Sequence, residues 1–236
     1  MSILLKNIIK STPVLGGLAA SLNQAIKNKK LAETAKNFKS QDYWEGRYRE
    51  NGNSGAGSYH HFAEFKAEII NTFVSEKNII SVLELGCGDG NQLKLAKYRK
   101  YIGFDVSKKS ITLCKELFKN DASKEFRLMD KYENEKSQLT LSLDVIYHLV
   151  EDEVFNKYMK ILFSASEKFV IIYASNTDDQ SLTSAIHVRH RKFTTWIESN
   201  CPEWHLLKYL PNKYPYNGDT TKTSFADFYI FERGDK

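Results

Sequence analysis

SVLELGCGDGNQLKLAKYRKYIGFD, residues 81–105, is the stretch that decides the fold of this chain. Val82–Leu85 is an apolar run of strand length, and a turn with three glycines follows it. A short helical pattern and a second apolar strand come next, and this strand ends at Asp105. Glycine lacks a Cβ atom, so the turn can adopt positive φ and let a ligand lie against bare backbone.

The turn and the acid after it point to one class of ligand. The turn opens a helix whose first N–H groups lack intrahelical partners, so these groups can bind acceptor atoms. A carboxylate at the end of the next strand, at Asp105, suits a grip on ribose hydroxyls. The stretch therefore predicts a nucleoside site at the C-terminal edge of a parallel sheet. A GxGxG turn alone does not name the nucleoside, because nicotinamide-binding turns look similar.

ELGCGDGNQL (84–93), followed by GFDVS (103–107), resembles motif I and the second acidic motif of class I S-adenosylmethionine-dependent methyltransferases of the bacterial small-molecule and glycan type. The resemblance covers roughly Tyr43 to Phe231. It implies an α/β fold, a seven-stranded Rossmann-like sheet with its last strand antiparallel and helices on both faces. It also implies S-adenosyl-L-methionine as cofactor and S-adenosyl-L-homocysteine as product. The cofactor contacts that we expect come from Tyr43, Arg47, Glu84, Gly86, Cys87, Gly88, Asp89, Gly90, Asp105, Val106, Asp130 and Leu143. Asp130 is equally well read as a turn cap.

Length, charge and cysteine content bound the class of protein. The 236 residues suit one α/β domain with an extension. Cys87, Cys114 and Cys201 lack CxxC spacing, which argues for a reducing compartment and against a zinc site. No apolar run approaches the ~20 residues of a membrane span. We expect a cytoplasmic protein, and we see no convincing metal cluster.

The basic charge is concentrated in the first 40 residues. These hold seven lysines and one acid, a local net charge of +6, so the remaining residues sum to −1 within the total of +5. Apolar residues recur there at helical spacing, which predicts a basic N-terminal helical extension. It packs on the domain or on a second subunit, or it attaches peripherally to an anionic membrane surface. We see no secretory signal.

The domain is expected over 41–236, with a lid and leading helix in 41–75, a cofactor-binding core in 81–174, and acceptor-side elements with a C-terminal hairpin in 175–236. Tyr43–Tyr59, YWEGRYRENGNSGAGSY, combines aromatic residues with glycines, and this predicts a lid that orders on binding. The alternative is a surface loop with a packed aromatic residue. The other expected elements are helices at 62–73, 107–119 and 151–166, strands at 126–129, 139–143 and 168–174, and a hairpin of 205–210 with 225–231.

Two clusters are candidates for the acceptor side. His148 follows the fourth strand and is the first candidate for a general base, because imidazole has a suitable pKa; the alternative is a structural histidine. His187–Lys192 holds two histidines, two arginines and a lysine, and is either a solvated helix face or an anion clamp. His187 and His190 are second base candidates. The expected substrate contacts are Tyr59, Tyr147, Arg189 and Arg191.

These features predict O-methylation of a small molecule or glycan, such as a sugar, phosphorylated sugar or phosphate-type oxygen, in surface-polysaccharide or secondary-metabolite biosynthesis. A sulfonium methyl group needs alignment with its acceptor, and a base only if the acceptor is protonated. An anionic acceptor is favoured by the basic cluster. No Asn-Pro-Pro-Tyr signature and no RNA-binding appendage is present, so a nucleic-acid partner is not expected. The alternatives are an inactive cofactor-binding scaffold, a protein or other small-molecule acceptor, and an NAD-binding nucleotide-sugar dehydrogenase.

Overall fold

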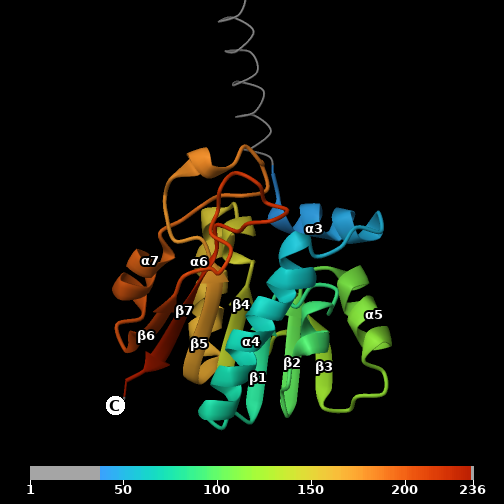
Figure 1. Ribbon diagram of the computed structural model, residues 1–236. Coiled ribbons are helices and arrows are strands. Elements are labelled where there is room, and N and C mark those ends of the chain that lie inside the picture. The colour runs from blue at the N-terminus through green and yellow to red at the C-terminus, as the bar shows by residue number, and fades with distance from the viewer. Residues whose placement is uncertain (1–37, 235–236) are drawn as a thin grey trace, which may run out of the picture. The chain divides into compact units, whose positions relative to one another are not determined.

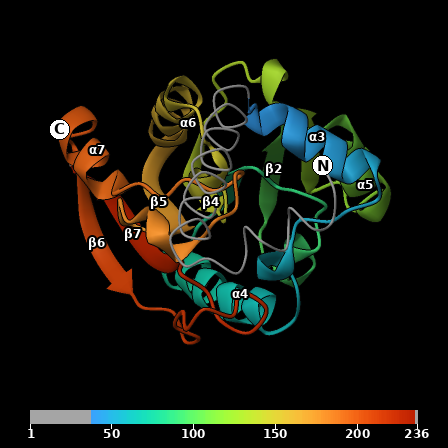
Figure 2. The same ribbon diagram turned by 90° about the horizontal axis from the view of Figure 1, so that it is seen from above.

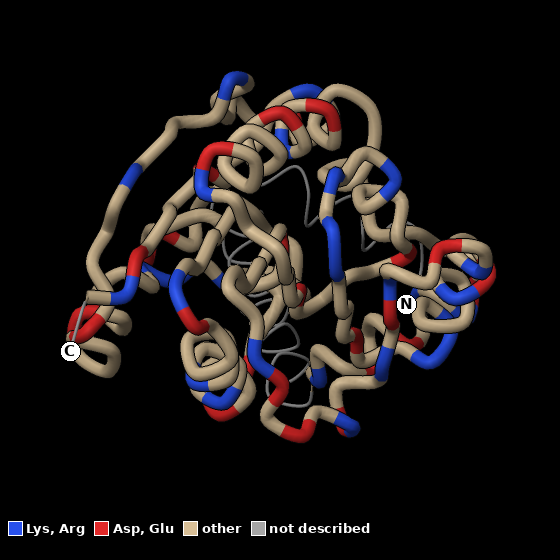
Figure 3. The backbone as a smooth tube through the Cα atoms, turned by 90° about the horizontal axis from the view of Figure 1, so that it is seen from below, with Lys and Arg blue, Asp and Glu red and all other residues tan. Residues whose placement is uncertain are grey.

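A computed structural model describes residues 38–234. The chain divides into Met1–Phe38 and Lys39–Lys236, and the elements below belong to the second unit. The expected basic helical extension therefore lies outside the described residues, apart from its last few positions. No helix among residues 38–234 has both the length and the apolar character that a membrane span requires. Basic and acidic residues are interspersed over the described part of the chain (Figure 3).

Seven strands form one sheet in the order β3-β2-β1-β4-β5-β7-β6 (Figure 1). β1 to β5 are parallel, whereas β7 pairs antiparallel with both β5 and β6. This confirms the predicted fold class, including the antiparallel last strand. The strands are β1 Ser81–Leu85, β2 Lys100–Asp105, β3 Lys124–Leu128, β4 Ser137–Leu143, β5 Ser166–Ala174, β6 Trp204–Leu210 and β7 Asp227–Arg233.

The helices lie on both faces of the sheet, with α4 on one face and α6 on the other (Figure 2). β4 and β5 are consequently buried almost throughout, as strands covered on both faces must be. Ser107 caps α5 as predicted, because its side chain accepts from the backbone N–H of Ser110. The helices are α3 Ser40–Arg49, α4 His60–Glu76, α5 Lys108–Leu117, α6 Asp152–Ser164 and α7 Phe193–Asn200.

One prediction of local structure was wrong, and one of the two alternatives for His187–Lys192, the helix face, is excluded. No α-helix follows the glycine turn, because the turn uses much of the short connection to β2 and only a four-residue 3-10 helix, Gln92–Leu95, remains. His187–Lys192 is not a helix face: this segment is a loop that precedes α7. Its backbone is held by distant groups instead, since Arg189 N donates to the Tyr147 carbonyl at 2.7 Å.

Candidate cofactor and acceptor site

The sheet topology fixes where a ligand can bind. From β1 the chain proceeds to β2 and β3 on one side, and from β4 it proceeds to β5 on the other. The crevice between the ends of β1 and β4 is therefore the topological switch point, where ligands bind in open α/β sheets. Gly86 lines it with φ of +85°, and a Cβ atom there would lie 2.5 Å from Cγ2 of Val145. Only glycine fits this approach of the two strand ends.

The turn continues through Gly88, whose φ is +59°. Its N–H donates to Oδ2 of Asp105 at 3.0 Å, and Ser107 N donates to Oδ1 at 2.9 Å. Asp105 is only 8% exposed, and this burial raises the pKa of its carboxyl. Each carboxylate oxygen keeps a lone pair beyond these bonds, so the geometry fits the expected bond to ribose hydroxyls.

The other motif residues sit deeper. Glu84 is buried and accepts from the Tyr101 hydroxyl at 2.6 Å, and burial raises its pKa to about 7. Gly90 packs against α5, since a Cβ atom there would meet Cys114 Sγ at 3.1 Å. Cys87 is buried as well. These packing contacts hold the turn in place on the sheet and on α5. Direct contact with a cofactor stays a prediction for Glu84, Cys87 and Gly90.

A segment N-terminal to the sheet covers the glycine turn. We keep the term lid segment for Tyr43–Tyr59. Asp89 and Ser54 bond reciprocally: Ser54 N donates to Oδ2 of Asp89 and Asp89 N donates to Oγ of Ser54, both at 3.0 Å. The Tyr59 hydroxyl donates to the same Oδ2 at 2.7 Å. Tyr59, expected to contact the substrate, thus binds motif I, and this anchors the lid segment on the turn.

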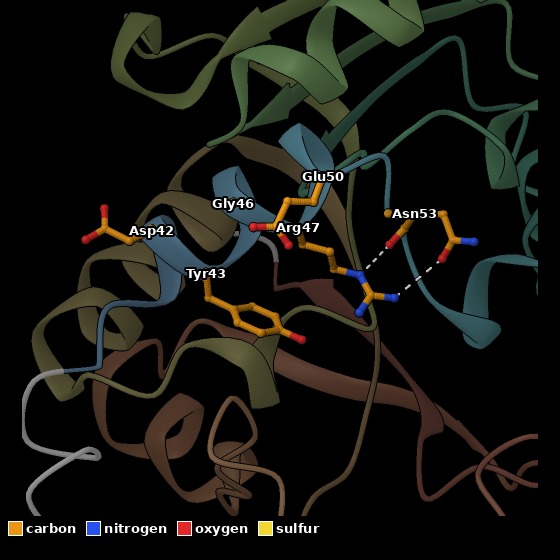
Figure 4. A pocket seen from close by; sticks show the side chains of 7 residues that line it. Asp42, Tyr43, Gly46, Arg47, Glu50 and Asn53 are labelled. Carbon is orange, nitrogen blue, oxygen red and sulfur yellow. Dashed lines mark hydrogen bonds between the residues drawn. The ribbon is translucent and has the colours of Figure 1, made fainter.

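Tyr43 and Arg47 line a cavity of about 620 Å³ beside α3, with Asp42, Gly46, Glu50, Gly52 and Asn53. Figure 4 shows Arg47 reaching Asn53, and Nε of Arg47 donates to its carbonyl at 2.7 Å. Tyr43 stacks on His187 with ring centroids 4.5 Å apart. The cavity therefore borders on the loop that precedes α7. Contact between these two residues and the cofactor stays a prediction.

His148 lies within a group of aromatic rings. Its ring centroid is 4.8 Å from Trp44, 4.6 Å from Tyr147 and 5.4 Å from His187. Burial lowers the pKa of His148 to about 4, so the imidazole is neutral at pH 7. Nδ1 lies 2.9 Å from the carbonyl oxygen of His187. Because a carbonyl only accepts, the proton must be on Nδ1, which leaves Nε2 as an unprotonated acceptor.

His190 is not brought together with His148. It is 1% exposed, its Nδ1 lies 2.7 Å from Oγ of Ser175, and its ring packs edge-on against Phe225. A base must reach its substrate, so this burial favours a structural role for His190. His187 remains half-buried at the ring stack. The lowered pKa of both histidines has burial as its main cause.

Arg189 and Arg191 do not form an open anion clamp. Arg191 is 8% exposed, donates to the carbonyls of Leu149 and Val150, and pairs with Asp152 at 3.1 Å. Arg189 donates to the same Val150 carbonyl and also contacts Asp152. These bonds tie the loop to the start of α6 and engage both terminal nitrogens of Arg191, whereas only Nη1 of the 43% exposed Arg189 is engaged. The geometry favours a structural role, most clearly for Arg191.

The remaining expected contacts lie at strand ends. Leu143 is buried at the end of β4, and Val106 is half-buried after β2. Asp130 is exposed in the 3-10 helix Met129–Lys131 after β3, and its contact with the cofactor stays a prediction. No three His, Cys, Asp or Glu side chains among the described residues group closely enough to hold a metal ion.

Sequence reasoning missed an ion pair at the crevice. Lys66 of α4 is 0% exposed, and its Nζ lies 2.6 Å from Oδ2 of Asp144. The Tyr147 hydroxyl donates to Oδ1 of the same carboxylate at 2.6 Å. Asp144 adopts φ of +60° directly after β4. The available signal was Lys66 itself, a lysine within the apolar stripe that Phe62, Ile70 and Phe73 form on α4.

Comparisons with known structures agree with this geometry at the level of the fold. The bacterial methyltransferase domain CtHen1-C aligns at 18% identity over 72% of this chain and 97% of its own, with a TM-score of 0.56. Magnesium protoporphyrin IX methyltransferase from Synechocystis PCC 6803, with bound S-adenosylhomocysteine, aligns at 14% sequence identity over 82% of this chain and 98% of its own. The TM-score is 0.59. N-methyltransferase NodS from Bradyrhizobium japonicum WM9 aligns at 13% sequence identity over 74% of this chain and 88% of its own, with a TM-score of 0.57. A search of curated proteins finds no significant match.

One family model matches residues 57–192, more than half of the chain, and it is described as the mRNA (guanine-N(7))-methyltransferase domain. The match runs from the lid segment to the start of α7 and includes the whole glycine turn. Positive-φ glycines at the switch point and a buried acid after β2 fit S-adenosyl-L-methionine. The chain belongs to this family and is a class I S-adenosylmethionine-dependent methyltransferase.

Proposed function

We propose that the enzyme transfers the methyl group to a hydroxyl oxygen of a small molecule or glycan. The observation that carries the proposal is His148, a neutral imidazole whose tautomer is set by the His187 carbonyl and whose Nε2 is left unprotonated. A neutral hydroxyl must lose its proton as the methyl group transfers, so such an acceptor needs a group of this kind.

S-adenosyl-L-methionine supplies an electrophilic methyl group on a sulfonium sulfur when it is bound. The chain supplies alignment, exclusion of water and a destination for the proton. Among the rings around His148, that of Trp44 is only half-buried, and it can offer an apolar face to a sugar or planar acceptor. In this proposal Nε2 of His148 would accept the proton of the acceptor hydroxyl.

An anionic acceptor is less well supported by the geometry. Arg191 is buried against Leu149, Val150 and Asp152, so its donors are occupied. We therefore place the uncharged hydroxyl ahead of the phosphate-type oxygen. A sugar hydroxyl in surface-polysaccharide or secondary-metabolite biosynthesis remains within the proposal, since aromatic rings suit the apolar face of a sugar.

A second candidate is methylation of a ring nitrogen in a purine. The observation that favours it is the match to a family named for guanine N7, which spans Gly57 to Lys192. A ring nitrogen carries a free lone pair and loses no proton, so this reaction needs no base. The two candidates therefore differ in how strongly they depend on His148.

The test is release of S-adenosyl-L-homocysteine from the full chain with a panel of acceptors. The panel holds free sugars, nucleotide sugars, sugar phosphates, GTP and a guanosine cap dinucleotide. For a hydroxyl acceptor we expect His148→Ala to lower turnover by about 10²–10⁴-fold, with partial recovery at high pH. Turnover of the cap dinucleotide that survives His148→Ala would establish the second candidate. Cofactor binding without turnover of any acceptor in the panel would favour the inactive scaffold.

A further inference from the structure

The crevice holds more negative than positive groups. Glu84, Asp105 and the side chain of Asp144 are all largely buried near the ends of β1, β2 and β4, and their 6%, 8% and 13% exposures leave little contact with water. Lys66 is the buried ammonium among the described residues that pairs with this group, through Asp144. A buried ion pair is costly unless its geometry is good, and breaking one leaves an uncompensated charge. When its three carboxyl groups are ionised, the group therefore carries a net negative charge.

Asp144 is the carboxylate of this group whose side chain lies against the lid segment. Val145, the next residue, contacts Gly86 across the switch point, and Oδ2 of Asp144 would lie 2.7 Å from a Cβ atom at Gly57 of the lid segment. The carboxylate thus borders on both the turn and the segment that covers it. Its backbone N–H donates to the Tyr173 carbonyl at 2.9 Å, and Lys66 and Tyr147 hold its two oxygens. Asp144 has little freedom to turn away from the crevice.

The two forms of the cofactor differ in charge. S-adenosyl-L-methionine carries a sulfonium, whereas S-adenosyl-L-homocysteine has a neutral thioether in its place. We propose that Asp144, fixed by Lys66 and Tyr147, is a specificity-determining residue that makes the site prefer the charged cofactor over the neutral product. Lys66 sets the strength of this preference, because its ammonium opposes the field of the carboxylate. The proposal concerns only the cofactor and does not depend on which acceptor is methylated.

Other ionisable groups face the same carboxylate and must be accounted for. Asp144 interacts electrostatically with Tyr147 and His148 on its own segment and with Tyr173 on β5, and Lys66 interacts with Glu84 on β1. Glu84 in turn interacts with Asp105 on β2. At pH 8.5 the carboxyl of Glu84, whose pKa is raised to about 7, is mostly ionised, and His148 is neutral. The test is therefore made at that pH, where the charges of the group are fixed.

The experiment is calorimetric titration of the full chain with three probes. These are S-adenosyl-L-methionine, S-adenosyl-L-homocysteine, and sinefungin, which carries an amine in place of the transferable methyl group. For Asp144→Asn we expect the ratio of the S-adenosyl-L-homocysteine to the S-adenosyl-L-methionine dissociation constant to fall about tenfold, from loss of a charge–charge attraction. A distortion that weakens all probes equally leaves the ratio unchanged.

Controls keep the test decisive. Asp121→Asn breaks another Lys–Asp pair, with Lys124, between α5 and β3, and should leave the ratio as it is. If Asp144→Asn does not fold, the double variant Lys66→Met/Asp144→Leu replaces the pair by apolar side chains, which proteins often tolerate. The ratio should fall in this variant too. An unchanged ratio in a folded Asp144 variant overturns the proposal, whereas loss of turnover with every acceptor would not.

Discussion

The glycine turn and the loop His187–Lys192 both stand out in the sequence, yet they are built in opposite ways. In the turn, Gly86 and Gly88 adopt positive φ and leave backbone beside the switch point. In the loop, the guanidinium of Arg191 donates hydrogen bonds to the carbonyls of Leu149 and Val150 and to the Asp152 carboxylate. In this chain, glycines that the backbone conformation requires therefore indicate the binding site more reliably than a cluster of charged residues does. Four predictions test this contrast, from the largest expected effect to the smallest.

Gly88→Val should abolish binding of S-adenosyl-L-methionine, with affinity lost by more than about 100-fold. A Cβ atom there would overlap Oγ of Ser54 and lie 3.1 Å from the Tyr48 hydroxyl, and φ of +59° strains any β-branched residue. Calorimetry measures the loss. Gly46→Ala is the matched control, because the nearest atom to its Cβ, Nη2 of Arg49, lies at 3.9 Å. Normal affinity in a folded Gly88→Val protein would contradict the assigned turn.

Arg191→Ala should destabilise the fold by about 1–3 kcal/mol, because it leaves the Leu149 carbonyl without this donor and removes one of the two arginines that hold the Val150 carbonyl and Asp152. Arg189→Ala should cost less than about 1 kcal/mol, since that side chain is 43% exposed. Urea denaturation of both variants provides the comparison. Unchanged stability of Arg191→Ala together with a raised Michaelis constant for an anionic acceptor would restore the anion clamp.

His148 should make the folded state sensitive to acid. Its pKa is about 4 in the folded chain against a usual value of 6.5, so the unfolded chain binds more protons between these values. The free energy of unfolding should therefore fall as the pH drops from about 6.5 to about 4, by about 3 kcal/mol at most. His148→Phe removes this contribution and should flatten the pH dependence in that window. The same slope in both proteins would show that His148 is ordinarily solvated.

Ser54→Ala should have the smallest effect, since it removes one bond to Asp89 and one to Tyr48 at the surface of the turn. A net cost of about 1 kcal/mol corresponds to roughly fivefold faster hydrogen exchange in Tyr43–Tyr59. Adding S-adenosyl-L-homocysteine should slow exchange there in the natural chain. Identical exchange with and without the ligand would argue against a lid.

The sequence allowed much of the fold to be predicted because the decisive signals are local. Apolar runs mark β4 and β5, Ser107 caps α5, and glycines mark the turn at the end of β1. The partners of Arg191 lie about 40 residues away, and no local pattern announces them. Lys66 and Asp144 likewise meet only once α4 packs on the sheet. The prediction of a helix after the turn was wrong because hydrophobic periodicity does not show how few residues remain between the turn and β2.

The reciprocal bonds of Asp89 have a consequence for how fast ligands arrive. Three hydrogen bonds, two with Ser54 and one with Tyr59, hold the lid segment on the turn. If the lid segment opens by breaking these three bonds, at about 1 kcal/mol each, the open state would be near 1% of molecules. A typical association rate of about 10⁷ M⁻¹s⁻¹ would then fall to about 10⁵ M⁻¹s⁻¹. At high ligand concentration the observed binding rate would reach a plateau equal to the rate at which the lid segment opens. The rate of cofactor binding would then depend on the protein and no longer on the cofactor concentration.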